Sequence, residues 1–134
     1  MKVYFLLIIS LFSTGLSQSS SLYYHKTPSD INTGEPIEIS QLLFTDLGIE
    51  QGMLYFRNKG KMSYQEVAMR FVDGKWVGLI PGDRVTPIGI EYLTVLTKFD
   101  GGRIALPLID NPFDSPLVIN INAGDSSSKI RKTK

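Results

Sequence analysis

The side chains that could perform acid–base chemistry lie mostly in or beside turn-like segments of this 134-residue sequence. His25 is the single histidine, which excludes a site with several histidine ligands and makes any catalytic triad depend on this residue. It precedes a turn, and we interpret it as a surface or edge histidine. The sequence has no nucleophile elbow, zinc-protease helix motif, P-loop or dinucleotide-binding glycine motif. We therefore predict no catalytic residue and no enzyme.

Two carboxylate pairs, Asp83 with Glu91 and Asp110 with Asp114, could serve glycoside hydrolysis, which needs two acids beside the scissile bond. Asp110, Asn111 and Asp114 could also offer oxygen atoms to Ca²⁺, but their spacing is not that of a calcium loop. Acids in turns mostly accept hydrogen bonds from the nearby backbone. We therefore predict structural roles for these acids, and neither a metal site nor another cofactor.

Aromatic rings that could stack on a sugar form a third group: Tyr23, Tyr24, Tyr55, Tyr64, Trp76 and Tyr92. Trp76 and Tyr92 lie within β-rich runs, where aromatic side chains mainly fill a core, so we expect both to be internal. Tyr55 and Tyr64 flank the NKGK turn and are the pair that we expect at the surface. They are the candidate ligand-binding residues of this sequence.

Short β-rich runs separated by turn signals must position these side chains. Seven runs have the strand pattern, and they span residues 36–44, 52–58, 63–71, 75–80, 90–99, 103–109 and 115–122, with a shorter apolar piece at 22–28. The dipeptide Asp73-Gly74 lies between two of these runs, and Asp100-Gly101 lies between two others. Both are strong hairpin signals, so the flanking runs should pair antiparallel.

Three details refine this pattern. Val67, Met69 and Phe71 alternate with Glu66, Ala68 and Arg70 and should share one face of a strand. The alternation of the run 36–44 slips at Gln41, which predicts a bulge or a chain end with both faces covered. Pro107 cannot donate a ladder hydrogen bond, so its strand should lie at a sheet edge or end near that point.

The number of runs and the spacing of the turns predict an all-β fold, an antiparallel immunoglobulin-like β-sandwich of about seven to eight strands. The stretch from Ile80 to Gly102 fits its corner. Pro81 and Gly82 end one strand, and Pro87 and Gly89 turn the chain across the end of the sandwich. Tyr92 then enters the next strand where a tyrosine corner would stand, so we expect its hydroxyl to bond to nearby backbone.

The two ends of the chain differ from this domain in composition. Residues 1–17 have the layout of a signal peptide, with Lys2 followed by an apolar core too short to span a bilayer, and residues 18–21 form a Ser-rich spacer. The domain should cover residues 22–122, and residues 123–134 should be a disordered basic tail or a linker. We therefore expect a secreted protein, in the periplasm or at the cell surface, with no membrane span after signal cleavage.

The charge of the chain limits the class of its binding partners, and its cysteine content limits how the domain is stabilised. The last six residues hold four of the fourteen basic residues and Lys2 is another, so residues 18–128 carry nine basic against all thirteen acidic side chains, a net charge of −4. This body is a poor match for nucleic acid, whose binding depends on phosphate neutralisation. Because the chain has no cysteine, the domain must be held by its hydrophobic core without disulfides.

Three segments carry a resemblance to known proteins. They are GEPIEIS at 34–40, GMLYFRN at 52–58, and the block from Trp76 through IPG at 80–82 to the Glu91-Tyr92 pair. Between Tyr24 and Gly102 the order of these pieces resembles immunoglobulin-like or fibronectin-III-like modules of bacterial secreted and cell-surface proteins. The resemblance implies a shared scaffold without catalytic residues.

We therefore expect a non-catalytic module that mediates structural or protein–protein interactions at the cell envelope, with an unknown protein or glycan as its partner. The alternative is a carbohydrate-binding accessory domain that uses exposed aromatic residues. Tyr55 and Tyr64 would then supply the binding surface.

Overall fold

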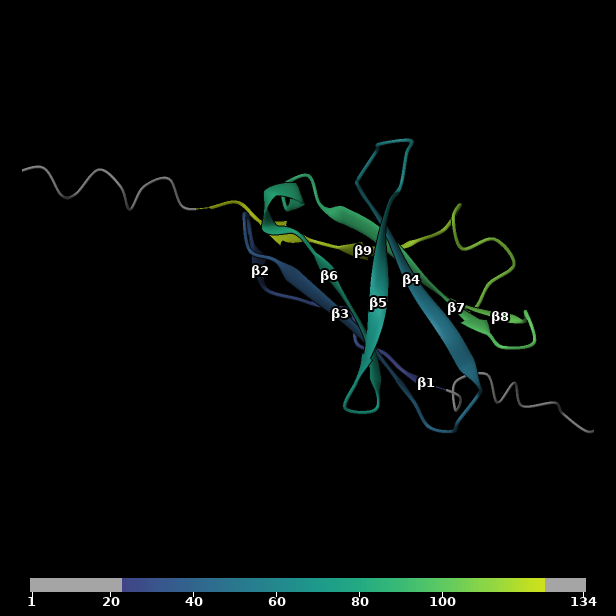
Figure 1. Ribbon diagram of the computed structural model, residues 1–134. Helices are drawn as coiled ribbons and strands as arrows, with labels where there is room; N and C mark the ends of the chain where they lie inside the picture. Colours follow the sequence, from purple (N-terminus) through teal and green to yellow (C-terminus); the bar gives the residue numbers. More distant parts are fainter. Residues whose placement is uncertain (1–22, 125–134) are drawn as a thin grey trace, which may run out of the picture.

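The computed structural model describes residues 23–124, which form β-strands and one short 3-10 helix (Figure 1). The strands are β1 (Tyr23–Tyr24), β2 (Ile31–Asn32), β3 (Ile37–Leu43), β4 (Ile49–Asn58), β5 (Gln65–Val72), β6 (Lys75–Ile80), β7 (Ile90–Lys98), β8 (Arg103–Leu106), β9 (Leu117–Ile119) and β10 (Ile121–Asn122), and the 3-10 helix is η2 (Gly82–Arg84). The all-β prediction is confirmed. Within residues 23–124, no helix has the length and hydropathy to cross a membrane.

Some predictions lie outside the described residues. These are the signal peptide at 1–17, the Ser-rich spacer at 18–21, and the basic tail apart from its first two positions, which have no regular secondary structure.

One curled sheet, in the order β1-β3-β6-β5-β4-β7-β8 with β9 also on β7, forms the body of the domain. Its two halves share β5, because residues 65–69 of that strand pair with β4 and residues 70–72 pair with β6. The first half therefore consists of β1, β3 and β6 with residues 70–72 of β5. The second half consists of β4, β7, β8 and β9 with residues 65–69 of β5. This order matches the two sheets of constant-type immunoglobulin domains, so the predicted sandwich class is confirmed.

One strand pair departs from the antiparallel expectation. β2 runs parallel to β10, with Ile31 opposite Ile121. The N-terminal segment thus pairs with β3 of the first half through β1, and a few residues later with β10 through β2. It ties the two halves together along one side of the sandwich.

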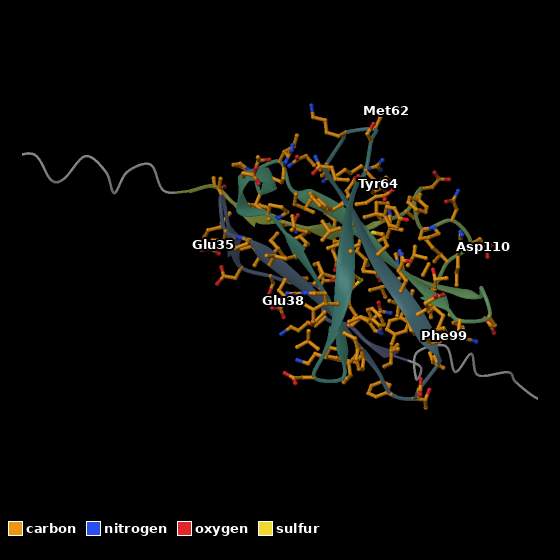
Figure 2. All side chains as sticks on the ribbon, in the orientation of Figure 1. Glu35, Glu38, Met62, Tyr64, Phe99 and Asp110 are labelled. Atoms are coloured by element: carbon orange, nitrogen blue, oxygen red, sulfur yellow. The ribbon has the colours of Figure 1, made fainter. Side chains whose placement is uncertain are left out.

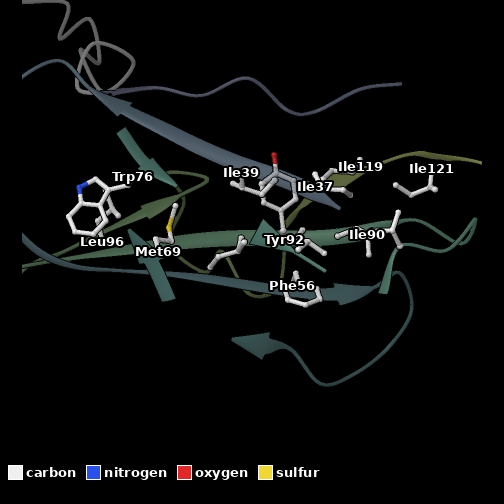
Figure 3. Close-up of a cluster of buried hydrophobic side chains, with 13 residues drawn as sticks. Ile37, Ile39, Phe56, Met69, Trp76, Ile90, Tyr92, Leu96, Ile119 and Ile121 are labelled. Carbon is white, nitrogen blue, oxygen red and sulfur yellow. The ribbon is translucent and has the colours of Figure 1, made fainter. Parts of the chain in front are cut away.

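The two halves face each other across a single core (Figure 3). Its buried members come from both halves: Ile37, Ile39, Leu54, Phe56, Met69, Trp76, Ile80, Val85, Ile90, Tyr92, Leu96, Ile119 and Ile121. Gly52 leaves room for one of them, because a Cβ atom at Gly52 would lie 2.9 Å from Cε3 of Trp76. Trp76 is only 8% exposed and fills the space that the missing side chain leaves.

The slip at Gln41 agrees with the second of its two explanations, whereas the prediction for Phe71 is wrong. β3 pairs with β6 without interruption from Ile37 to Leu42, so the slip is no bulge, and Gln41 lies buried on the same face as Ile39. β3 ends at Leu43, and both Leu42 and Leu43 are partly buried there, as a strand end with both faces covered requires. Phe71 does not share the buried position of Met69 and is 60% exposed. The reason is that β5 leaves β4 after Met69 and continues in the other half of the sheet.

The hairpin predictions hold. Asp73 and Gly74 both have positive φ values, 50° and 79°, the combination of a two-residue turn that matches the twist of a hairpin, and they join the antiparallel strands β5 and β6. β7 and β8 also pair antiparallel across the second signal. β8 ends at Leu106, directly before Pro107, and lies at the edge of the sheet as predicted.

Candidate functional site

The corner between β6 and β7 contains four of the residues that the sequence singled out. β6 ends at Ile80, after which Pro81 precedes helix η2. Gly82 lies against another backbone segment, since a Cβ atom there would stand 2.3 Å from the carbonyl oxygen of Gly34. Pro87 follows Thr86 in a turn that the N–H of Gly89 closes by donating to the Thr86 carbonyl at 3.1 Å. These contacts shape the backbone of the corner.

Tyr92 is fully buried, and its hydroxyl points out of the core cluster (Figure 3). The expected backbone partner is wrong, because this hydroxyl bonds to Nε2 of His25 at 2.6 Å and lies 3.4 Å from Oγ1 of Thr27. Burial raises the pKa of Tyr92 to about 12, and the contact with Thr27 opposes this shift. At the pH of any cell the phenol therefore stays protonated and available as a hydrogen-bond donor.

His25 is half-buried and is more than the surface histidine that we expected. Nδ1 lies 2.7 Å from the carbonyl oxygen of Ser40, which can only accept, so Nδ1 carries the proton in the neutral ring. Nε2 then accepts from the Tyr92 hydroxyl. Burial lowers the pKa of His25, and the bond to Ser40 opposes this shift. Both ring nitrogens are thus engaged within the protein, as they are in a structural histidine.

The acidic candidates do not gather into a site. Glu91 forms an ion pair with Arg57, at 2.6 Å between the carboxylate and Nε. Asp114 accepts a hydrogen bond from the side-chain amide of Asn111 at 2.6 Å, so that amide presents its nitrogen to the carboxylate. Among residues 23–124, no group of three or more metal-ligating side chains lies close enough together to hold an ion.

Tyr55 and Tyr64 are brought together by a residue that the sequence analysis did not single out. The ring of Phe113 lies edge-on to both, with centroids 5.1 Å from Tyr55 and 5.5 Å from Tyr64. The Tyr64 hydroxyl donates to the Phe113 carbonyl at 2.7 Å, and the guanidinium of Arg57 lies 4.2 Å above the Tyr64 ring. Tyr64 is thus held between protein groups on both sides, next to the hairpin whose tip carries Met62 (Figure 2).

Phe113 comes from the segment between β8 and β9 and crosses the outer face of the second half. β8 and β9 lie on one side of β7, and Tyr55 of β4 lies on the other, so the segment must pass over β7 to reach it. Leu93 is opposite Tyr55 in register and is fully buried although it is outside the core between the halves. The crossing builds a wall on an otherwise open sheet face.

A groove of about 320 Å³ lies beside this wall. We call it the sheet-face groove; its lining is Gln51, Met53, Tyr55, Val95, Thr97, Arg103 and Phe113. Met53 is opposite Val95, and Gln51 is opposite Thr97. Each such cross-strand pair forms one rung of the groove floor, so the floor has one apolar and one polar rung. Arg103 is opposite Thr97 on the next strand. The groove therefore changes from aromatic and apolar at one end to polar and cationic at the other.

A second concave surface lies at the end of the sandwich where the β3–β4 loop, the β5–β6 turn and the β7–β8 turn meet, which we call the loop end. Its pocket has a volume of about 530 Å³ and is lined by Leu43, Phe44, Thr45, Asp46, Ile49, Phe71, Gly74 and Trp76. The ring of Phe71 lies 5.5 Å from that of Trp76, and Phe71 and Phe44 are 60% and 56% exposed. Three features meet here: a preformed hollow, an indole at its base and two exposed phenyl rings at its rim.

Sequence reasoning missed Phe113, Phe44 and Arg103 for different reasons. Phe113 follows Asn111-Pro112 in a stretch with no strand pattern, and only its contacts with β4 reveal its position. Phe44 was counted within a strand, but β3 ends at Leu43 and leaves it in a loop. Arg103 is one cation among fourteen basic residues, and nothing in its neighbours marks it.

No protein-family model matches this chain, and no curated protein is similar to it in sequence. The candidate surfaces are therefore interpreted from their own geometry.

Proposed function

We propose that this domain is a non-catalytic interaction module of a secreted or cell-envelope protein, and that it binds a protein partner at the loop end. The observation that supports this most is the cluster of exposed phenylalanine rings there. Phe44 and Phe71 line the pocket, and Phe99 is 74% exposed beside it, with its N–H donating to the carbonyl of Gly48 in the β3–β4 loop. Figure 2 places Phe99 at the opposite end of the molecule from Met62.

The chemistry of the pocket suits an apolar side chain of a protein. Contiguous exposed apolar surface is rare on soluble domains and marks interaction sites. Aromatic rings lose little conformational entropy on binding and dominate the energetics of protein interfaces. Trp76 is held in place by core neighbours, so the base of the pocket is preformed. Asp46 on the lining favours a partner with a basic residue beside its apolar anchor.

The use of the ionisable groups supports a non-catalytic role. Both nitrogens of His25 are bonded within the protein, and Glu91 is paired with Arg57. A general base needs a free lone pair directed toward a substrate. The lone pair of His25, the single histidine, already accepts a hydrogen bond from the Tyr92 hydroxyl.

A photo-crosslinking amino acid at Phe71 tests the proposal, and the same replacement at Leu79 is the control. Leu79 is 52% exposed but lies on β6 away from the pocket lining. We expect a crosslinked protein in an envelope fraction at position 71 and not at 79. The purified partner should then bind at least about tenfold more weakly to the F71S variant and should shift the fluorescence of Trp76, the single tryptophan.

Three outcomes would overturn the proposal. They are no adduct at position 71, equal adducts at 71 and 79, and adducts only between two copies of this chain.

Carbohydrate binding is a second candidate function, supported by the sheet-face groove. Tyr55 and Phe113 give it an aromatic wall, and Gln51, Thr97 and Arg103 supply polar groups at its other end. Aromatic rings pack against the C–H face of a pyranose, while polar side chains bond to its hydroxyls. A panel of polysaccharides tested by affinity electrophoresis should reveal a retarded band that the Y55A variant loses. Unretarded migration with every polysaccharide would rule this function out.

A further inference from the structure

We propose that the sheet-face groove binds one uronic acid unit of an acidic glycan, with the sugar ring against Tyr55 and Phe113 and its carboxylate paired with Arg103. This inference rests on the carbohydrate-binding candidate function and specifies its ligand class. The groove is separate from the loop end, because the two pockets share no lining residue.

The aromatic wall is rigid. Phe113 is fixed from two sides, by the edge-on contact with Tyr55 and by the hydrogen bond from the Tyr64 hydroxyl to its carbonyl. Tyr64 is in turn covered by Arg57, which the ion pair with Glu91 holds in place. A wall that does not move on binding loses little entropy when a ligand packs against it.

The floor of the groove is apolar next to the wall and polar beyond it. A sugar ring can therefore pack its C–H face on the apolar part and bond its hydroxyls to the polar part. Met53 and Val95 lie next to the wall and are only partly buried. The next rung brings the amide of Gln51 and the hydroxyl of Thr97, each of which can both donate and accept. Neighbouring rungs on one face are about 7 Å apart, about the width of a single sugar ring.

The far end of the groove is cationic. The described residues form two ion pairs, Arg57 with Glu91 and Lys98 with Asp100, and Arg103 belongs to neither. No aspartate or glutamate lines the groove. A guanidinium offers a planar fork of donors that matches a carboxylate, so this end selects an acidic sugar over a neutral one.

The volume limits the ligand. About 320 Å³ is at the lower end of the range for small-molecule sites, which is enough for one ring with its substituents.

Isothermal titration with oligogalacturonate, oligomannuronate and methyl-esterified oligogalacturonate tests the inference. The ester keeps the ring and removes the charge. We expect at least one of the two acidic oligomers to bind, and we expect the ester to bind about tenfold more weakly than oligogalacturonate. R103Q should reduce binding of the acidic oligomers about tenfold and leave the ester unchanged, so that the acid and ester become equal.

The R70Q variant is the matched control, since it removes the same charge from an exposed position on β5 outside the groove. F113A should weaken acid and ester alike. Circular dichroism and thermal unfolding must show that each variant keeps the fold of the parent protein.

The outcomes separate the two levels of the proposal. Equal binding of acid and ester, or loss of acid binding in R70Q as large as in R103Q, overturns the uronate inference and leaves carbohydrate binding in place. Binding of a neutral polysaccharide without either acidic oligomer does the same. No binding of any oligosaccharide or polysaccharide overturns both.

Discussion

Nε2 of His25 and the hydroxyl of Tyr92 lie 2.6 Å apart, and their hydrogen bond joins the N-terminal segment to the central strand β7. The other ring nitrogen of His25 donates to Ser40 of β3, so one imidazole links the first half of the sheet to the second. The rings also meet edge to face, with centroids 5.7 Å apart. These contacts hold the segment from Tyr23 to Thr27 along the edge of β3, where β1 already pairs with Leu42 and Leu43.

Replacing Tyr92 with phenylalanine should lower the free energy of unfolding by about 1 kcal/mol, because the change removes a hydrogen bond and leaves Nε2 of His25 without its donor. Urea denaturation followed by tryptophan fluorescence measures this loss. Tyr24→Phe is the control, since Tyr24 is 56% exposed and its change should be nearly neutral. Equal stability of Tyr92→Phe and the parent would show that the hydroxyl contributes nothing.

Protonation of His25 should destabilise the domain. Burial lowers the pKa of His25 below its usual value of 6.5, so the folded protein resists a proton that the unfolded chain accepts. The free energy of unfolding should therefore fall as the pH drops below about 6.5, and this part of the loss should end below the folded-state pKa. The hydrogen bond itself survives, because protonated Nε2 can donate to the Tyr92 oxygen, and desolvation of the charge carries the effect.

Nuclear magnetic resonance measures this pKa directly, since the chain contains one histidine and gives one set of imidazole signals. A His25→Gln variant should show a flatter dependence of stability on pH between about pH 5.5 and 7.5, a range above the titration of most carboxylates. A titration midpoint at or above 6.5 in the folded protein would contradict the prediction.

The strands and hairpins were predictable because their determinants are local. The Asp73-Gly74 pair has the positive φ values that its turn requires, and this turn fixes the pairing of β5 with β6 whatever lies around it. Ile37 and Ile39 alternate with polar residues and are buried as the period of two implies. The burial of side chains in a strand that keeps the same neighbours along its whole length follows the alternation of its own sequence.

Features that depend on distant contacts were not predictable in this way. Phe71 continues the alternation of Met69 but becomes exposed, because β5 changes partner between them. His25 is bonded to a residue 67 positions away, and Phe113 meets Tyr55 only after its segment crosses β7. Only part of the candidate site was predictable from the sequence. Tyr55 was predicted from its place beside a turn, whereas Phe113 and Arg103, at the two ends of its groove, come from other parts of the chain.

A polar pair in the core gives a third prediction. The hydroxyl of Thr94 donates to Oε1 of Gln41 at 2.8 Å, and both side chains are fully buried. These residues join β3 to β7, one strand from each half of the sheet. Among the described residues, no group accepts a hydrogen bond from Nε2 of Gln41.

Thr94→Val should lower the free energy of unfolding by about 1 to 3 kcal/mol, because it leaves the whole Gln41 amide unpaired in the core. The double change to Gln41→Met and Thr94→Val should recover this loss, since an apolar pair of similar shape has no polar group to desolvate. Chemical denaturation of the two single variants and the double variant completes a mutant cycle. A double variant less stable than Thr94→Val would show that the amide is paired in solution.

The last prediction concerns the corner at Gly82. A Cβ atom there would stand 2.3 Å from the carbonyl oxygen of Gly34 and 3.2 Å from the nitrogen of Pro36, and backbone atoms of a neighbouring segment cannot swing aside as a flexible side chain does. Gly82→Ala should therefore separate η2 from the turn before β3 and lower the free energy of unfolding by about 3 kcal/mol. Gly124→Ala is the matched control, because no atom of the described residues lies within 4 Å of its Cβ position. Thermal unfolding of the two variants decides the matter: equal midpoints would mean that the corner has room for a side chain and that Gly82 is needed for some other reason.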